Sequence, residues 1–521
     1  MDTFLRPAPW IHSPRSIAVR LFLTCWLVYS LHVATNTVRE IYLALAIGDH
    51  LSFRVDEYAH MHPDLFEKPG YGWHIGANPG ASMLGAIPYA ASRPVVDRVV
   101  AAVNRSRAGV KDAPVYNSPW PLARKFFEES WRHGYDLKFG LAAIIMQAFC
   151  MAPISALAAV AMFYLLRRVF GSDRTGLWMA LLYAFGTPAF FRTGYLNHNL
   201  MLGEFAFMGF LAMWNPGESR RISESRRFLL GGLAGGTALL MDYSGVVFLL
   251  GLFLYGIAKA GGLGAIGRVA RLSSWYVAGT LPPVLLLWFY QWASFGNAFL
   301  PGQNWMPPVE WIDKGYQGFT LPQMDLLRNL LIDYRYGLFA TCPLLLLALL
   351  APLWNRGERR SIAGREFAVL LGLPFALLLF CGGISYTRLQ YNTGLRYLAP
   401  LLPFLFVPAA MALRRLPGPA RYGIAVAAVA QAWCMAMYRD VERGLGVLDP
   451  IIHVFTGGFQ LPVLTVLSRM TQYAEYTGAG VSPLPILALA AAAIYGFWAI
   501  GSSESAGLSP ARESKSVGAS R

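Results

Sequence analysis

Residues 139–166 read FGLAAIIMQAFCMAPISALAAVAMFYLL and contain no charged side chain. As a helix, a stretch of this length and character crosses the apolar core of a lipid bilayer. Arg167 and Arg168 follow it directly, and basic residues next to a membrane helix usually mark its cytoplasmic end. The stretch therefore predicts a membrane span whose C-terminal end faces the cytoplasm.

The composition of the 521 residues agrees with this interpretation. Hydrophobic residues make up 55% of the chain and charged residues 14%, and the mean hydropathy is +0.41. Soluble domains carry about 25% charged residues, so a soluble enzyme is excluded. The net charge of +15 does not predict nucleic-acid binding, because no basic patch alternates with aromatic residues. The five cysteines form no C-x-x-C pair, so neither a disulfide framework nor a zinc site is expected.

Apolar runs of similar length recur and predict an all-α polytopic membrane protein with about twelve transmembrane helices. No small-residue cleavage site follows the first run, which is therefore interpreted as an uncleaved helix. The predicted helices cover residues 17–35, 139–166, 175–191, 199–214, 228–241, 244–258, 274–293, 336–354, 367–383, 397–413, 422–437 and 484–500.

Every second connection is short and basic; these connections contain Arg168, Arg227, Arg268, Arg360 and Arg415. By the positive-inside rule they are cytoplasmic, and so are both termini. Residues 1–16 are then a cytoplasmic segment, residues 17–503 the membrane domain, and residues 504–521 a cytoplasmic tail predicted to be disordered. We expect a multi-pass protein of a bacterial plasma membrane.

The outer connections hold most of the polar chemistry, and they cover residues 36–138, 294–335, 382–396 and 438–483. In the first of them, the weakly apolar stretch 81–103 contains Pro88 and Pro94, which predicts an interfacial helix rather than a span. Few ionisable groups lie inside the predicted spans, the exceptions being Glu204 and Asp242. Transporters usually carry polar groups near mid-membrane, so the asymmetry favours an enzyme working at the outer surface.

The densest group of chemically active side chains lies soon after the first predicted helix. Asp56, Glu57, His60, His62 and Asp64 fall within nine positions. Two imidazoles and several carboxylates can supply a general base, a metal site or both. The alternative is a solvated polar loop, and the spacing matches no strict ligand motif.

Two further sets have both a structural and a functional interpretation. The stretch 71–80, with His74 and Asn78, is rich in glycine and ends in Asn-Pro-Gly, which a tight turn alone explains. Arginines lie at the predicted outer helix ends: Arg39, Arg192, Arg335, Arg388 and Arg396. Their guanidinium groups suit phosphate, or else they reach the lipid headgroups from apolar surroundings. His198 lies at another outer helix end, where a structural hydrogen-bond donor is the alternative to a functional group.

In their order along the chain, several motifs resemble those of the GT-C superfamily of integral-membrane glycosyltransferases. The likeness is to bacterial members related to protein O-mannosyltransferases and aminoarabinose transferases. The stretches that carry it are 36–46, Val55-Asp56-Glu57-Tyr58, Asp64, 78–88, 187–198, 231–243, 295–297, 334–343 and 394–403. The sequence departs from the pattern at Ala77 and Asn78, where many relatives have a lysine. The stretch 104–138 is longer than usual and is predicted to shape an acceptor site.

The resemblance implies a GT-C-like fold with a large first outer loop that contains interfacial helices. It also implies inverting transfer of a sugar from a polyprenyl-phosphate carrier to a lipid, glycan or protein acceptor at the outer face. Asp56 is then the expected general base, with Glu57 and Asp64 as neighbours or substitutes. The expected contacts to the donor phosphate are Arg39, Arg388, Arg396 and His198. The expected contacts to the acceptor are Tyr58, His74 and Asn78.

The implied chemistry needs no redox cofactor, and a divalent metal is optional, with His60, His62 and Asp64 as its candidate ligands. Membrane lipids are expected partners and nucleic acid is not. A transporter or flippase of a lipid-linked sugar, or a noncatalytic scaffold for envelope assembly, remains the alternative. The sequence does not identify the sugar, the acceptor or the length of the carrier.

Overall fold

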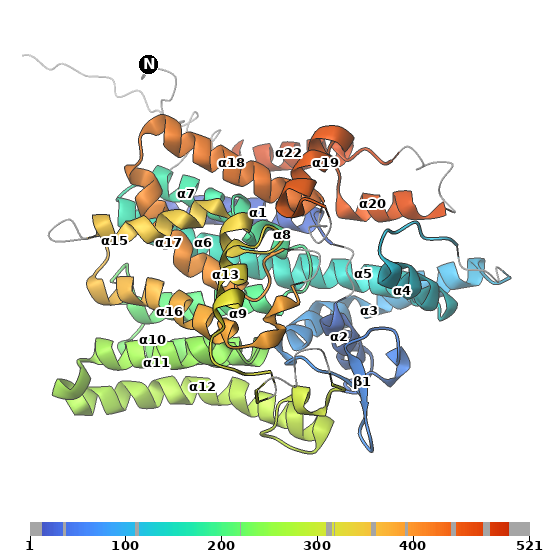
Figure 1. Cartoon of the computed structure of the whole chain (residues 1–521), viewed down its shortest axis with the longest axis horizontal. Helices are drawn as coiled ribbons and strands as arrows, with labels where there is room; N and C mark the ends of the chain where they lie inside the picture. The colour runs from blue at the N-terminus through green and yellow to red at the C-terminus, as the bar shows by residue number, and fades with distance from the viewer. Residues whose placement is uncertain are drawn as a thin grey trace, which may run out of the picture.

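The computed structural model is mostly helical, and its long helices lie roughly side by side (Figure 1). It describes residues 13–34, 38–109, 114–218, 220–308, 315–316, 318–355, 361–390, 394–438, 444–471 and 480–499. Most of the predicted N-terminal segment 1–16 and the whole predicted tail 504–521 lie outside these residues.

Helices form on each of the apolar runs. The first half of the chain contains α1 (Pro14–Leu31), α5 (Asp136–Met146), η2 (Gln147–Met151), α6 (Ala152–Phe170), α7 (Asp173–Phe185), α8 (Ala189–Arg192), α9 (His198–Trp214), α10 (Glu224–Met241) and α11 (Gly245–Ala260). The second half contains η3 (Gly262–Ala265), α12 (Ile266–Phe295), α14 (Leu338–Thr341), η5 (Pro343–Leu350), α15 (Ala351–Trp354), α16 (Gly364–Gly382), η8 (Ala399–Leu401), α17 (Leu402–Arg415), α18 (Gly418–Met437) and α22 (Leu484–Ala499).

Three helices of the described chain are long and apolar enough to cross a membrane: Asp136–Phe170, Ile266–Phe295 and Gly364–Gly382. A fourth span results if the pair Gly446–Gly457 and Pro462–Arg469, bent by 70°, is counted as one. Shorter apolar helices cover 245–260, 343–354 and 484–499. The chain therefore has several candidate spans, while the number of about twelve stays a prediction.

One expectation about local structure was wrong. The run 336–354 is not one helix, because the backbone leaves helical geometry at Cys342, directly before Pro343. The helix predicted over 81–103 is present as α3 (Gly80–Ser106), which continues through both of its prolines.

The first outer loop folds into small elements on the ends of the membrane helices. It contains α2 (Arg39–His50), η1 (Asp56–Tyr58), α3, α4 (Pro121–Arg132) and a hairpin of β1 (Leu65–Lys68) and β2 (Gly72–Ile75). The hairpin is a departure from the all-α prediction. Its strands are antiparallel with Leu65 opposite Ile75, and the connecting turn has positive φ at Gly70 and Gly72, a geometry that glycine adopts readily.

Further elements lie in the other predicted outer connections. They are η4 (Gly302–Trp305), α13 (Met324–Ile332), η7 (Ser385–Arg388), η9 (Gly446–Leu448), α19 (Asp449–Gly457) and α20 (Pro462–Arg469). In Figure 1 the hairpin, α3, α4 and α20 gather at the right-hand end of the horizontal helices. Elements of the first and the last predicted outer connection thus lie at the same end of the molecule.

Specific contacts fasten the first outer loop to the bundle. The Asn78 side chain donates a hydrogen bond to the carbonyl of Leu239 on α10 (2.7 Å). The ring of Phe66 on β1 stacks on that of Phe295 at the end of α12, with centroids 6.0 Å apart. The loop therefore has a fixed position over α10 and α12.

The helices α10 and α12 approach each other through glycine. A Cβ added at Gly232 would lie 1.8 Å from the carbonyl oxygen of Tyr276, and one at Gly279 would lie 2.0 Å from that of Leu229. Small residues let the backbones of membrane helices touch, and packing at such contacts drives their association. The ends of α10 and α12, which support the outer loop, depend on this contact.

Gly232→Val is expected to destabilise the protein by about 1–3 kcal/mol, because the larger side chain forces the two backbones apart. Thermal unfolding in detergent measures the loss. Gly372→Val on α16 is the control, since a Cβ there meets nothing within 4 Å. Equal melting temperatures for the two variants would contradict the close contact of α10 and α12.

Candidate active site

A cavity of about 1470 Å³ lies between the first outer loop and the outer ends of the bundle. Its polar end is formed by the start of α2, the loop before β1, the junction of α8 and α9, and the loop before η8. Residues from these four segments include Arg39, Glu40, His62, Asp64, Arg192, His198, Gln390 and Arg396. Segments far apart in the sequence thus bring charged side chains into one space.

Glu40 is the most buried carboxylate of this end, with a side-chain exposure of 3%. Its Oε1 lies 2.8 Å from Nδ1 of His198 and 3.3 Å from Nε of Arg39. On the other side of the ring, Nε2 of His198 lies 3.8 Å from Asp242 at the end of α10. The carboxylate therefore joins α2 to α9 and fixes the direction of the Arg39 side chain.

This environment changes the ionisation of Glu40. Burial opposes the charged form, but His198 and Arg39 outweigh it and hold the pKa of the carboxyl well below its usual range. Glu40 is therefore ionised at neutral pH and acts as a fixed negative charge.

Asp64 is the partly exposed carboxylate beside Arg39; Glu40, Glu129, Asp136 and Asp449 also line the cavity. Its Oδ2 lies 3.3 Å from Nη1 of Arg39, and its side chain is 28% exposed. The backbone amide of Asp64 donates to Nδ1 of His62 (3.0 Å). Burial lowers the pKa of His62, so a largely neutral imidazole stands beside this carboxylate. Asp64 thus combines a fixed position with contact to whatever occupies the cavity.

Two more arginines belong to the polar end. Arg192 is fully buried and donates to the carbonyl oxygen of Gly394 (2.5 Å) and to the hydroxyl of Tyr195. The backbone amide of Arg396 donates to Oε1 of Gln390 (2.8 Å), and its guanidinium lies 5.0 Å from the ring of Tyr397. With Arg39, these residues give the polar end of the cavity three guanidinium groups, which suits an anionic ligand.

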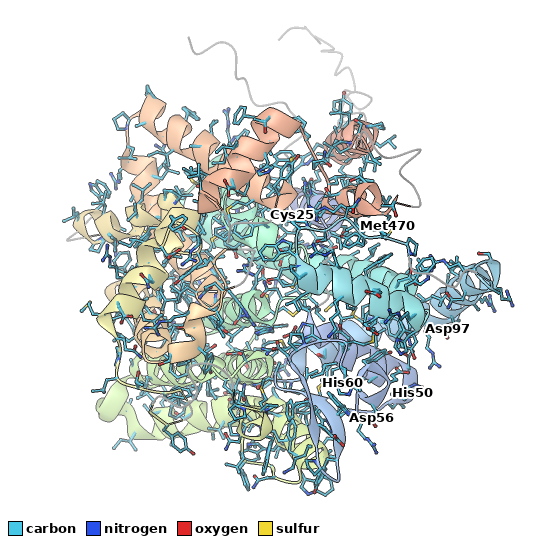
Figure 2. All side chains as sticks on the ribbon, turned by 45° about the vertical axis from the view of Figure 1, so that its right-hand side comes forward. Cys25, His50, Asp56, His60, Asp97 and Met470 are labelled. Carbon is cyan, nitrogen blue, oxygen red and sulfur yellow. The ribbon has the colours of Figure 1, made fainter. Side chains whose placement is uncertain are left out.

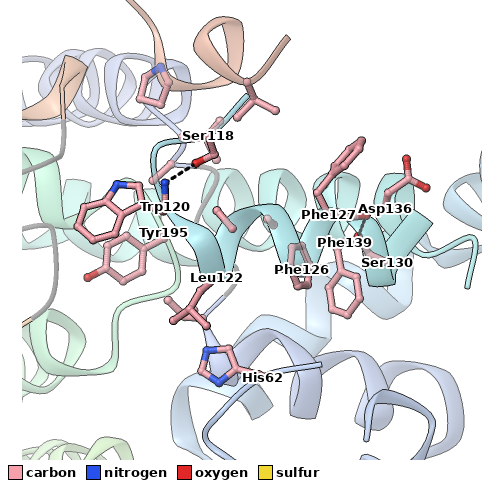
Figure 3. A pocket seen from close by; sticks show the side chains of 18 of the residues that line it. His62, Ser118, Trp120, Leu122, Phe126, Phe127, Ser130, Asp136, Phe139 and Tyr195 are labelled. Atoms are coloured by element: carbon pink, nitrogen blue, oxygen red, sulfur yellow. Dashed lines mark hydrogen bonds between the residues drawn. The ribbon is translucent and has the colours of Figure 1, made fainter. Parts of the chain in front are cut away.

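The remainder of the cavity wall is mostly apolar. Figure 3 shows Trp120, Leu122 and Phe126 at the start of α4, with Leu122 pointing toward His62. Leu141 and Ile144 on α5 and apolar residues of α20 complete this side. Leu122 is 68% exposed and Ile144 38%, so the apolar side of the cavity is open to its surroundings.

The acidic pair predicted from the sequence as base lies elsewhere. Asp56 is 2.6 Å from Nη2 of Arg54 and accepts a hydrogen bond from the amide of Trp73 (2.7 Å). Glu57 lies 3.9 Å from His50. Neither is among the described residues that line the cavity, and Figure 2 shows His50 and Asp56 close together on the first outer loop.

The predicted acceptor contacts Tyr58, His74 and Asn78 are not among the described residues that line the cavity. Tyr58 is buried among aromatic rings and accepts a hydrogen bond from Lys138 (3.2 Å). His74 is buried between the carbonyl oxygens of Phe53 and Tyr71, and Asn78 binds α10.

Arg388 lies at 2.6 Å from Asp325, outside the described lining of the cavity. Of the four predicted phosphate contacts, the structure therefore brings Arg39, Arg396 and His198 together and leaves Arg388 aside.

The metal ligands predicted from the sequence differ from the group of possible ligands in the structure. Within the described ranges, one group of three has its ligand atoms within 4.8 Å of one another, namely Asp49, His50 and Glu57. Lys138 lies 2.7 Å from Asp49, and Arg93 lies 3.4 Å from it. These cations already neutralise the carboxylate, so the group is a poor cation site. His60, His62 and Asp64 are not brought into such a group.

Two important residues were missed as site residues by the sequence reasoning. Glu40 directly follows Arg39 and begins an apolar stretch, IYLALAI, and a carboxylate on a buried helix is a recognisable signal. Asp242 was recognised as an acid near a helix end but was not placed with His198. Its position there depends on the packing of α10 against α9.

Comparisons with known proteins give a structural likeness alone. No protein-family model matches the chain, and no curated protein sequence matches it significantly. The chain is similar in structure to ArnT from Cupriavidus metallidurans in the apo state, at 15% identity and a TM-score of 0.45, over 93% of this chain and 75% of that one. It is likewise similar to ArnT from the same organism bound to undecaprenyl phosphate, at 14% identity and a TM-score of 0.47, over 93% of this chain and 76% of that one.

Glu40→Gln is expected to lower stability at pH 7 by roughly 2–3 kcal/mol, since it leaves His198 and Arg39 without their buried anion. Because the pKa of Glu40 is lowered on folding, its contribution is fully present above the ordinary carboxyl pKa of 4.5 and is lost as the pH falls below it. Thermal unfolding of wild type and variant between pH 7 and pH 3 should therefore show a constant difference above about pH 4.5 and a shrinking difference below it.

Glu67→Gln is the control for this pH series, because Glu67 is exposed on β1. It should change stability little at any pH. A difference between wild type and Glu40→Gln that grows toward acid would contradict the assignment of a lowered pKa to Glu40.

Proposed function

We propose that the protein is a glycosyltransferase that moves a sugar from a polyprenyl-phosphate carrier to an acceptor at the outer face of the membrane. One observation carries the proposal: the cavity has a cationic end and an open apolar side. An anionic headgroup on a long hydrocarbon chain has the same two-part character. The ordered GT-C-like motifs of the sequence support the same substrate class.

The donor phosphate is assigned to Arg39 and Arg396. Both residues line the cavity, and each guanidinium group has a neighbour that holds it: Glu40 lies 3.3 Å from that of Arg39, and that of Arg396 donates to the carbonyl of Leu389 (3.4 Å). Fixed cations of this kind stabilise negative charge that develops on a leaving group. A leaving phosphate accepts the electron pair of the broken bond and needs no proton from a general acid.

Asp64 is the proposed general base. In the reaction an acceptor hydroxyl oxygen attacks the anomeric carbon of the sugar, and the bond from that carbon to the phosphate oxygen breaks. Its electron pair stays on the polyprenyl phosphate, and the hydroxyl proton passes to the carboxylate. Asp64 lines the cavity beside Arg39, whereas Asp56, the base expected from the sequence, is engaged by Arg54.

The proposed location is a bacterial plasma membrane with both termini in the cytoplasm. The basic connections of the sequence support this orientation. Trp498 on α22 donates to the hydroxyl of Thr24 on α1 (3.0 Å), so helices from the two ends of the chain lie side by side. That arrangement agrees with termini on the same side of the membrane.

Asp64→Asn is expected to lower the rate of sugar release from the carrier by about 10²–10⁴-fold, because the amide cannot accept the proton. Asp56→Asn is the matched control and should retain most of the activity. The measurement uses purified protein in lipid with a panel of radiolabelled polyprenyl-phosphate sugars.

Three outcomes of this assay count against the proposal. Loss of activity in Asp56→Asn alone would identify Asp56, the residue expected from the sequence, as the general base. Donor binding without release in the wild type would indicate a transporter of a lipid-linked sugar. Neither binding nor release would indicate a noncatalytic scaffold.

Arg396→Gln is expected to weaken the binding of polyprenyl phosphate by about 10–100-fold, since it removes a charged hydrogen-bond donor worth about 1.5–3 kcal/mol. Arg388→Gln removes the same charge outside the described cavity lining and is the matched control. Binding of radiolabelled lipid to protein in nanodiscs measures both. Equal losses in the two variants would show a general electrostatic effect of the outer face.

A further inference from the structure

The helix α20 presents one apolar face to the cavity. Thr465 and Arg469 line it as well, but the apolar residues Val463, Val466, Leu467 and Met470 (the residue directly after the helix) predominate. Their spacing of three, four and seven positions places them on the same side of a helix. The helix therefore covers the cavity with hydrocarbon side chains, across from Leu122 and Phe126 on α4.

A glycine pair separates α20 from the helix before it. The segment Gly446–Gly457 and α20 enclose a bend of 70°, and Gly457 and Gly458 lie at its start. Gly458 has φ 78° and ψ −174°, a region of backbone space that glycine alone occupies readily. This is the composition and geometry of a hinge.

The other end of α20 is held by a short antiparallel contact with the first outer loop. Tyr116 pairs with Met470; the amide of Asn117 donates to the carbonyl of Arg469 (2.9 Å), and the amide of Thr471 to that of Val115 (3.1 Å). This latch, residues 115–117 with 469–471, joins two outer loops across the cavity. Backbone contacts this few in number open readily.

We propose that α20 is a flap, hinged at Gly457 and Gly458 and fastened by the latch, that closes over the hydrocarbon chain of the lipid-linked substrate. The inference rests on the proposed function and adds the element that admits and retains the lipid. Hydrocarbon is the matching occupant because apolar residues predominate on both elements, although Lys125 and Glu129 of α4 and Arg469 of α20 also line the cavity. The charged residues Arg39, Asp64 and Arg396, which suit the phosphate and the sugar, come from other segments.

The latch offers a direct test. In an antiparallel pair that is not joined by its own hydrogen bonds, the Cα atoms lie about 4.5 Å apart, which is within the range of about 4.4–6.8 Å that a disulfide spans. Tyr116 and Met470 form such a pair. The double variant Tyr116→Cys/Met470→Cys should therefore form a disulfide on mild oxidation. The five native cysteines are all buried, and oxidised wild type controls for them.

The experiment compares two orders of addition with radiolabelled undecaprenyl phosphate in nanodiscs. When the double variant is oxidised before the lipid is added, lipid uptake should slow by at least ~10-fold relative to the same variant reduced. When it is oxidised after the lipid has bound, dissociation should slow by at least ~10-fold, and reductant should release the lipid. The single-cysteine variants should show neither effect.

Two results would overturn the flap while leaving the proposed function in place. One is equal uptake and release in the oxidised and reduced double variant, which would make α20 a fixed wall. The other is failure of the disulfide to form, which would exclude the latch. If neither wild type nor the reduced variant binds the lipid, the proposed function falls and the flap with it.

The hinge has its own matched pair of variants. Gly458→Ala should slow lipid uptake, because alanine disfavours the backbone geometry of the hinge. Gly171→Ala is the control and should not slow lipid uptake. Gly171 also has a positive φ and open space around it, and it lies at the C-terminal end of α6. Equal uptake by the two variants would contradict a hinge at Gly458.

Discussion

The outer end of the molecule is organised around one buried carboxylate. Glu40 stands at the start of α2, and its Oε1 faces both His198 of α9 and the neighbouring Arg39. An ionised group with a side-chain exposure of 3% is tolerated only when opposite charges compensate it. The cost of burying this charge therefore fixes the first outer loop against the bundle and leaves Arg39 pointing toward Asp64.

Close backbone packing supplies the foundation for that arrangement. The glycines of α10 and α12 let the two helices touch, and the ends of these helices carry the contacts of Asn78 and Phe66. Asp242, at the end of α10, reaches the ring of His198 from the side opposite Glu40. A shift of α10 would consequently alter the cavity through two separate contacts, that of Asn78 with Leu239 and that of Asp242 with His198.

The cavity that results is divided by chemistry. Arg39, Glu40, Asp64, Arg192 and Arg396 form one end, and apolar residues of α4, α5 and α20 predominate elsewhere, where Arg107, Asp136 and Arg469 also line the wall. A lipid phosphate that carries a sugar would place its reacting carbon near the boundary between them, next to Asp64. The same division explains why α20, a helix with one apolar face and a glycine hinge, is suited to cover the chain rather than the headgroup.

The sequence by itself determined the helical class and the places where helices form, and it predicts that the polar chemistry is concentrated on the outer side. Hydropathy and the spacing of basic residues are local properties, and the membrane enforces them. It also identified Arg39, Asp64, His198 and Arg396, because charged groups at the ends of apolar runs stand out locally.

Only the tertiary structure decided that Asp64, and not Asp56, lines the cavity. Asp56 and Asp64 belong to the same short polar segment, and the path of the chain through η1 and the hairpin directs one toward Arg54 and the other toward Arg39. The pairing of Glu40 with His198 and the latch between Tyr116 and Met470 join segments far apart in the chain. Such contacts depend on how helices pack against each other, and no local pattern of residues encodes that packing.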